Sequence, residues 1–129
     1  MDVIDSNLTN VLSRDGVDEV VVGSLENLST ISVEELRKKM GNGSWAARLV
    51  KNDRFGGVII QQLPGEGNRL HYHPDDDECW VILAGEWEWY IDGEGTKKVS
   101  QNDIVVVQKG VKHKITCIGE NPGIRFAIT

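Results

Sequence analysis

The three histidines of this chain lie in two short segments that also contain a glutamate. One residue separates His71 from His73, Glu78 follows closely, and His113 lies in a distant segment. Imidazole nitrogen suits Zn, Cu, Fe and Ni, and a carboxylate oxygen admits Mn as well. These residue types therefore predict a single metal site, and they leave the identity of the metal open.

The spacing of the first two histidines explains how they could share one ion. Side chains at positions i and i+2 of a β-strand leave from the same face, so His71 and His73 can converge. Pro74 lacks a backbone donor and the aspartates at 75–77 favour turns, so we expect the chain to reverse there. Glu78 would then begin the returning strand and bring its carboxylate back beside the two imidazoles.

Two longer motifs contain these four residues. The segment Gly65–Gly85 resembles the first cupin motif, in which a glycine precedes an HXH pair, a glutamate and a second glycine, at every specified position. The segment 102–117 resembles the second cupin motif, with Gly110 and His113 in agreement. It departs from that motif at Asn102, Gln108 and Cys117, where the family usually has Gly, Pro and Asn.

This resemblance covers about residues 57–128 and implies a fold and a cofactor. The fold would be all-β, the cupin double-stranded β-helix or jelly-roll barrel, with a short N-terminal helix added. The cofactor would be one divalent transition metal per chain, Fe, Zn, Mn or Ni, held by His71, His73, Glu78 and His113. The superfamily includes dioxygenases, sugar isomerases and epimerases, lyases and non-catalytic binding modules, so the fold does not name a reaction.

Composition restricts the class of protein and its surroundings. At 129 residues the chain is long enough for one domain with its own core. A formal charge of -6 argues against nucleic acid or a membrane surface as partner, because these select basic faces. The chain lacks an apolar run of membrane-spanning length and a recognisable signal peptide, so we expect a cytoplasmic protein. Cys79 and Cys117 are then expected to be free thiols.

The local patterns divide the chain into two regions. Residues 1–44 are expected to be an N-terminal extension with a short helix at 33–40, where Ser32 and Glu35 form a capping box. Residues 45–129 are expected to form the cupin β-barrel domain. We expect an edge strand near 18–22 and a meander of nine strands at 45–51, 57–63, 68–73, 78–83, 86–91, 97–99, 103–108, 113–118 and 123–128, closed into a sandwich.

Strand parity selects candidate residues for a reaction beside the metal. Arg69 lies two residues before the first histidine and is expected to point toward the ion. It would either clamp an anionic substrate or pair with Glu66 or another acid at the rim. Trp80 is expected to form a wall of the same site. With every histidine committed to the metal, Tyr72 or Tyr90, a carboxylate or metal-bound water would have to move protons.

Three hypotheses for function follow from these residues. The first is a metal-dependent enzyme, a dioxygenase, an isomerase or epimerase, or a lyase, acting on a small polar and anionic metabolite. The second is a non-catalytic module that uses the metal to bind or sense a metabolite. The third is a structural metal protein whose barrel is filled by Trp80 and its neighbours. Exposed sheet edges also lead us to expect a homodimer.

Overall fold

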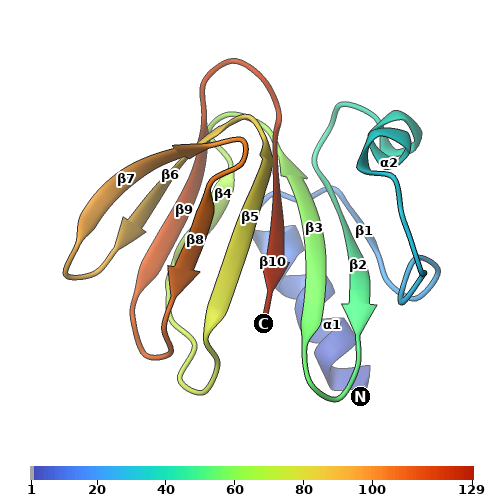
Figure 1. The fold of residues 1–129 in the computed structure, drawn as a ribbon, viewed down its shortest axis with the longest axis horizontal. Helices are drawn as coiled ribbons and strands as arrows, with labels where there is room; N and C mark the ends of the chain where they lie inside the picture. The colour runs from blue at the N-terminus through green and yellow to red at the C-terminus, as the bar shows by residue number, and fades with distance from the viewer. Residues whose placement is uncertain (1) are drawn as a thin grey trace.

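The computed structural model describes residues 2–129, in which two β-sheets face each other and two helices pack against one end (Figure 1). The helices are α1 (Asp2–Arg14) and α2 (Val33–Met40). The strands, in chain order, are β1 (Glu19–Val21), β2 (Trp45–Lys51), β3 (Gly56–Gln62), β4 (Gly67–His71), β5 (Glu78–Ala84), β6 (Glu86–Ile91), β7 (Gly95–Ser100), β8 (Ile104–Val107), β9 (His113–Ile118) and β10 (Gly123–Ile128). Neither helix is long and apolar enough to cross a membrane.

The strand order confirms the predicted all-β jelly-roll class and corrects its connections. One sheet has the order β1-β2-β3-β10-β5-β8 and the other the order β4-β9-β6-β7. Because β10 lies between β3 and β5, the chain crosses between sheets, and the expected meander is wrong. The described strands also form two separate hydrogen-bonded sheets, so the sandwich is open at its edges where we expected closure.

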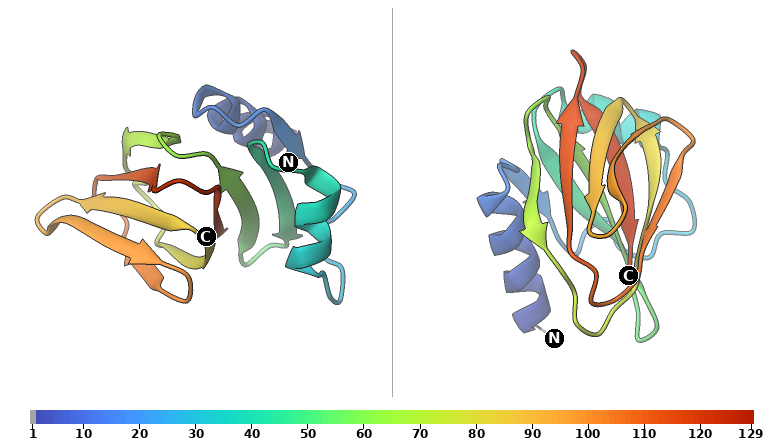
Figure 2. Two further views of the ribbon diagram at one scale, coloured as in Figure 1. Left: turned by 90° about the horizontal axis from the view of Figure 1, so that it is seen from above. Right: turned by 90° about the vertical axis from the view of Figure 1, so that its left-hand side faces the viewer.

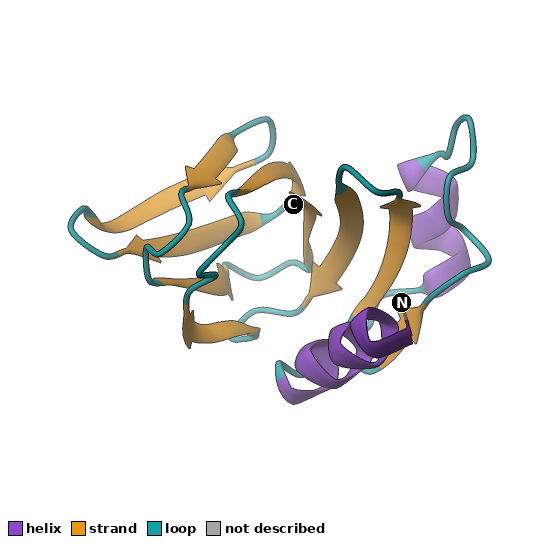
Figure 3. Cartoon of the chain, turned by 90° about the horizontal axis from the view of Figure 1, so that it is seen from below, coloured by secondary structure: helices purple, strands orange, loops and turns teal. Residues whose placement is uncertain are grey.

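Both faces of the β2–β3 end of the large sheet are covered by a helix, as Figures 2 and 3 show. Alternate residues of a strand leave on opposite faces. Ala46 and Ile60 therefore pack with Leu12 of α1, while Ala47 and neighbouring apolar residues pack with Leu36 of α2. The N-terminal segment also extends the sheet, because β1 pairs in parallel with β2.

The second helix forms where the capping signal predicts it. The Ser32 hydroxyl accepts a hydrogen bond from the backbone N–H of Glu35 at 3.1 Å, and Gly41 ends the helix with a φ of 90°. Helix α1 was not predicted. Its described apolar side chains, Leu8, Val11 and Leu12, are spaced for one helical face, but a short helix depends on the sheet that it covers.

The space between the two sheets is filled by large apolar side chains. Trp80 and Ile82 of β5 contact Trp87 and Trp89 of β6 and apolar residues of β8, β9 and β10, and all four are almost fully buried. The Trp80 and Trp89 rings lie 5.2 Å apart in an edge-to-face arrangement. This packed interior forms the floor beneath the four residues with metal-binding chemistry.

We expect Gly67→Ala to destabilise the fold, because a Cβ atom there would overlap the carbonyl group of Ile115 on β9. The two backbones would have to separate beside the strand that carries His113. We expect a loss of about 2 kcal/mol or more in the free energy of unfolding, measured by urea denaturation. Gly43→Ala is the matched control, since its Cβ would meet no atom within 4 Å. Equal stability of the two variants would contradict this packing.

Candidate metal centre

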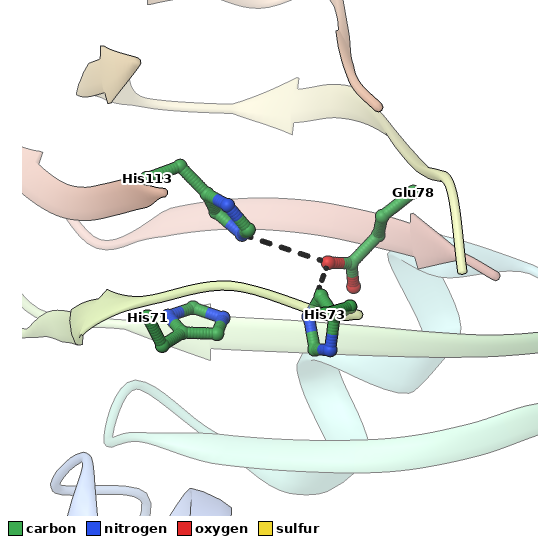
Figure 4. Close-up of side chains that lie close together, drawn as sticks. All are labelled: His71, His73, Glu78 and His113. Carbon is green, nitrogen blue, oxygen red and sulfur yellow. Dashed lines mark ion pairs between the residues drawn. The ribbon is translucent and has the colours of Figure 1, made fainter. Parts of the chain in front are cut away.

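Three strands and one loop bring the four predicted ligands together (Figure 4). His71 ends β4 and lies directly opposite His113, the first residue of β9. Glu78 begins β5, and His73 lies in the loop between β4 and β5. One donor atom from each residue lies within 4.8 Å of the others, so the group could hold a metal ion.

The route to this cluster differs in one respect from the sequence prediction. Strand β4 ends at His71. His73 therefore lies outside the strand in which the sequence prediction placed it. The two imidazole rings nevertheless meet, with centroids 5.0 Å apart and planes at 85°. The HXH pair therefore converges through a strand end and the following turn, because Pro74 interrupts the ladder directly after the second histidine.

Backbone carbonyl groups orient two of the imidazoles. His71 Nδ1 lies 2.7 Å from the carbonyl oxygen of Arg69, and His113 Nδ1 lies 3.1 Å from that of Val111. A carbonyl oxygen can only accept, so each Nδ1 carries the proton and each Nε2 presents a lone pair. Metal-binding histidines are usually oriented by such a contact to the other ring nitrogen.

The ligand atoms of the cluster fit a cation. His73 Nε2, His113 Nε2 and Glu78 Oε1 are buried and have no properly aligned hydrogen bond among the described residues. Glu78 Oε1 is 3.0 Å from His73 Nε2 and 3.7 Å from His113 Nε2. Buried polar atoms normally have a partner. One divalent ion would be a partner for all three, and the nitrogen-rich set with one carboxylate suits a transition metal.

Electrostatics hold the carboxylate in its metal-binding form. Burial raises the pKa of Glu78, but His113 and His73 outweigh that effect and lower this pKa to about 2. Contact with Glu78 raises the pKa of His73 against the opposing effect of burial. Burial is the main cause that lowers the pKa of His71, which favours its neutral form. An incoming metal would therefore have to displace a proton chiefly from His73.

Arg69 does not point toward this site, so the expectation from strand parity is wrong. Its side chain is 53% exposed, and its Nε lies 3.6 Å from Asp15 Oδ1. The register between β4 and β9 shifts between Asn68 and His71, as in a β-bulge. The Asn68 side chain accepts the hydrogen bond of Ile115 N–H at 2.9 Å. Of the two alternatives for Arg69, the ion pair is present, with Asp15 as the acid.

The other two candidate residues differ in their exposure to solvent. Tyr72 is 52% exposed between the two histidines of the HXH pair. Trp80 is buried beneath the cluster, with its ring centroid 5.4 Å from that of His113. A catalytic role for either residue is still a prediction. Tyr72 is therefore exposed and adjacent in sequence to two of the ligands, and Trp80 lies at the floor of the site.

Arg125 is an interior cation that the sequence reasoning missed. It is 2% exposed, and its Nη2 donates to Gln62 Oε1 at 2.9 Å. Its guanidinium carbon lies 5.3 Å from the ring centroid of Trp87. The signal was present in the strand at 123–128, because alternation from the small apolar residue Ala127 directs Arg125 to the same interior face.

Comparison with known proteins shows which family the chain resembles in sequence. Residues 58–128 match the family model described as Cupin domain. A stretch of 71 residues, 55% of this chain, is 35% identical to mannose-1-phosphate guanylyltransferase of Escherichia coli, but spans only 14% of that enzyme. A second relative, the protein YdbB of Bacillus subtilis, is 29% identical over 93 residues, which are 72% of this chain and 76% of YdbB.

Solved structures share the fold at low sequence identity. An rmlc-like cupin family protein from Methanocaldococcus jannaschii superposes with a TM-score of 0.66 and 19% identity, covering 83% of this chain and 92% of that protein. KdgF from Halomonas sp. gives a TM-score of 0.60 and 16% identity, covering 67% of this chain and 77% of KdgF. Both contain the same double-sheet arrangement, and at these identities the likeness concerns the fold alone.

His73→Ala should remove most of the bound metal, because it deletes one ligand and leaves Glu78 without its nearest imidazole. The loss of affinity should exceed the roughly 10- to 100-fold typical of changes outside the ligand set. Elemental analysis of protein purified without added metal or an affinity tag measures it. Tyr72→Ala is the neighbouring control and should keep its metal. Unchanged metal content in the His73 variant would remove this residue from the site.

Arg69→Ala should keep its metal and lose little stability. The ion pair joins the half-exposed Arg69 to an Asp15 side chain that is only 6% exposed, and solvent at the Arg69 end limits its contribution to about 1 kcal/mol in the free energy of unfolding. Metal content and urea denaturation of the variant, beside the wild type, test both statements. Loss of metal from this variant would show that Arg69 reaches the centre after all.

Proposed function

Because the chain belongs to the cupin family, and because four of its residues form a group suited to a metal ion, we propose that it is a mononuclear metal-dependent enzyme. The observation that carries this proposal is the convergence of three imidazoles and one carboxylate within 4.8 Å. The proposed reaction is of the dioxygenase type or of the isomerase or epimerase type, and its substrate is a small polar, anionic metabolite.

The division of tasks among the residues follows from their positions. A bound ion would supply Lewis-acid polarisation of the substrate or activation of oxygen, at positions that four protein ligands leave open. Val111 and Arg69 hold two imidazoles in one tautomer through their carbonyl oxygens. With all three histidines in the cluster, proton transfer falls to another group, and we propose Tyr72, which is exposed and lies between His71 and His73 in sequence.

The relatives are compatible with an anionic substrate. The Escherichia coli enzyme is named for mannose 1-phosphate, which carries a phosphate, although the matched stretch is a small part of it. From that name we take only the chemical class of the proposed substrate, a small anionic molecule. Sugar phosphates and small organic acids therefore form the first substrate panel.

A non-catalytic binding or sensing module is the alternative. It is favoured by the packed floor of the site, where Trp80, Ile82 and Trp89 fill the space beneath the ligands. A substrate would then bind toward the exposed side of His71 and His73, and the same metal could hold a metabolite without turnover.

Elemental analysis combined with an oxygen-uptake assay over the substrate panel tests the proposal. Iron, with uptake that depends on one of the acids, would support a dioxygenase. Zinc, nickel or manganese with conversion of a panel member but no uptake would support an isomerase or epimerase. Saturable binding without conversion would favour the alternative module. Purified wild-type protein that holds no transition metal and binds none on addition would contradict both functions.

A further inference from the structure

A backbone turn at 108–111 lies between the last residue of β8 and His113, at the same end of the sandwich as the loop that carries His73 (Figure 1). The Val111 N–H donates to the Gln108 carbonyl oxygen at 3.2 Å and closes this turn. Gly110 has a φ of 82°, which glycine adopts without strain. The backbone N–H groups of the two central residues, 109 and 110, are therefore available to donate to another segment.

Both of these N–H groups donate to the loop between β4 and β5. The Gly110 N–H donates to the His73 carbonyl oxygen at 2.7 Å. The backbone N–H of Lys109 donates to Asp77 Oδ1 at 2.9 Å. The loop is thus attached to the turn at two residues, the ligand His73 and the residue that directly precedes the ligand Glu78.

The same turn also contacts the third histidine. The Val111 carbonyl oxygen lies 3.1 Å from His113 Nδ1 and orients that ring. Val107, the residue before the turn, lies opposite Glu78 in the ladder between β5 and β8. One short backbone segment, 107–111, is therefore connected to three of the four candidate ligands, and the distance between His73 and His113 depends on how firmly the loop is attached to it.

Asp77 supplies the side-chain part of this attachment. Among the described residues, it is the one aspartate of 75–77 whose side chain forms a hydrogen bond. It is exposed and lies outside the apolar core, so the packing of the sandwich does not depend on it. Gln108 stands where the second cupin motif usually has proline, and glutamine does not restrain φ as proline does. A charge-assisted bond from Asp77 provides a restraint on the turn in its place.

We infer that Asp77 is a positioning residue of the metal centre. Its carboxylate joins the loop to the turn and so holds His73 and Glu78 at the separation from His113 that one ion requires. Without it, the loop moves away from the turn more readily, which weakens metal binding and speeds metal release. The inference rests on the proposed function, because it assumes that the four-residue cluster holds a metal ion, and it adds how this chain retains that ion.

Asp77→Ala tests the inference on the full chain, with zinc as the probe. Competition with a colorimetric chelator gives the dissociation constant, and stopped-flow transfer to excess chelator gives the rate of release. The variant should bind zinc roughly tenfold more weakly than the wild type, within the range for contacts that orient metal ligands, and it should release zinc faster. Equal affinity and an equal release rate in the two proteins would overturn the inference.

Two control variants separate position from charge, because each removes one negative charge as Asp77→Ala does. Asp77→Asn retains a side-chain oxygen that can accept from the Lys109 N–H, so zinc affinity should stay close to the wild-type value. Asp75→Ala removes a side chain without a hydrogen bond among the described residues, and it should also leave the affinity unchanged. A loss in either control equal to that of Asp77→Ala would assign the effect to charge and overturn the positioning role.

Stability of the metal-free protein separates positioning from a general loss of folding. Metal-free Asp77→Ala should unfold at the same urea concentration as the metal-free wild type, because the side chain is exposed. Weaker zinc binding that is matched by equal destabilisation of the metal-free fold would overturn the inference. Wild-type protein that binds no zinc would contradict the proposed function. Zinc binding by the wild type and equally by Asp77→Ala would contradict only the role of Asp77.

Discussion

The pairing of β4 with β9 is the constraint on which the metal centre depends. It places His71 opposite His113, although the two residues are far apart in sequence. The ladder contains a register shift, and the Asn68 side chain replaces a backbone acceptor there by accepting from Ile115 N–H. Gly67, which precedes Asn68 in β4, lets the backbones of β4 and β9 approach each other closely. The geometry of the site is therefore determined by backbone pairing as much as by the ligands.

The interior beneath the ligands combines apolar packing with a few polar N–H groups that lack a hydrogen-bond acceptor. The tryptophans fill the space between the sheets, which gives the site a rigid floor. Two of their indole N–H groups and one guanidinium nitrogen nevertheless have no acceptor among the described residues. A purely structural core would gain stability from apolar residues at these positions.

Much of the fold and most of the site could be predicted from short-range patterns. The bounds of the strands 45–51, 86–91, 113–118 and 123–128 agree with the structure to the residue, because glycines and turn residues delimit their apolar runs. The four candidate ligands do come together, since their spacing encodes a strand, a turn and a return. The direction of Arg69 was missed because a β-bulge changes parity without a clear signal in the sequence. Helix α1 was missed because its stability depends on packing against Ala46 and Ile60.

The concentration of imidazoles at one point has a practical consequence. Every histidine of the chain belongs to the same cluster, and His71, His73 and His113 differ in their surroundings. In a magnetic resonance spectrum, the imidazole ring signals of an ordinary sample would therefore come from this centre alone. A protein with histidines elsewhere would need mutants to assign such signals to its metal site. In the wild-type chain, every histidine ring signal therefore reports on what this centre binds.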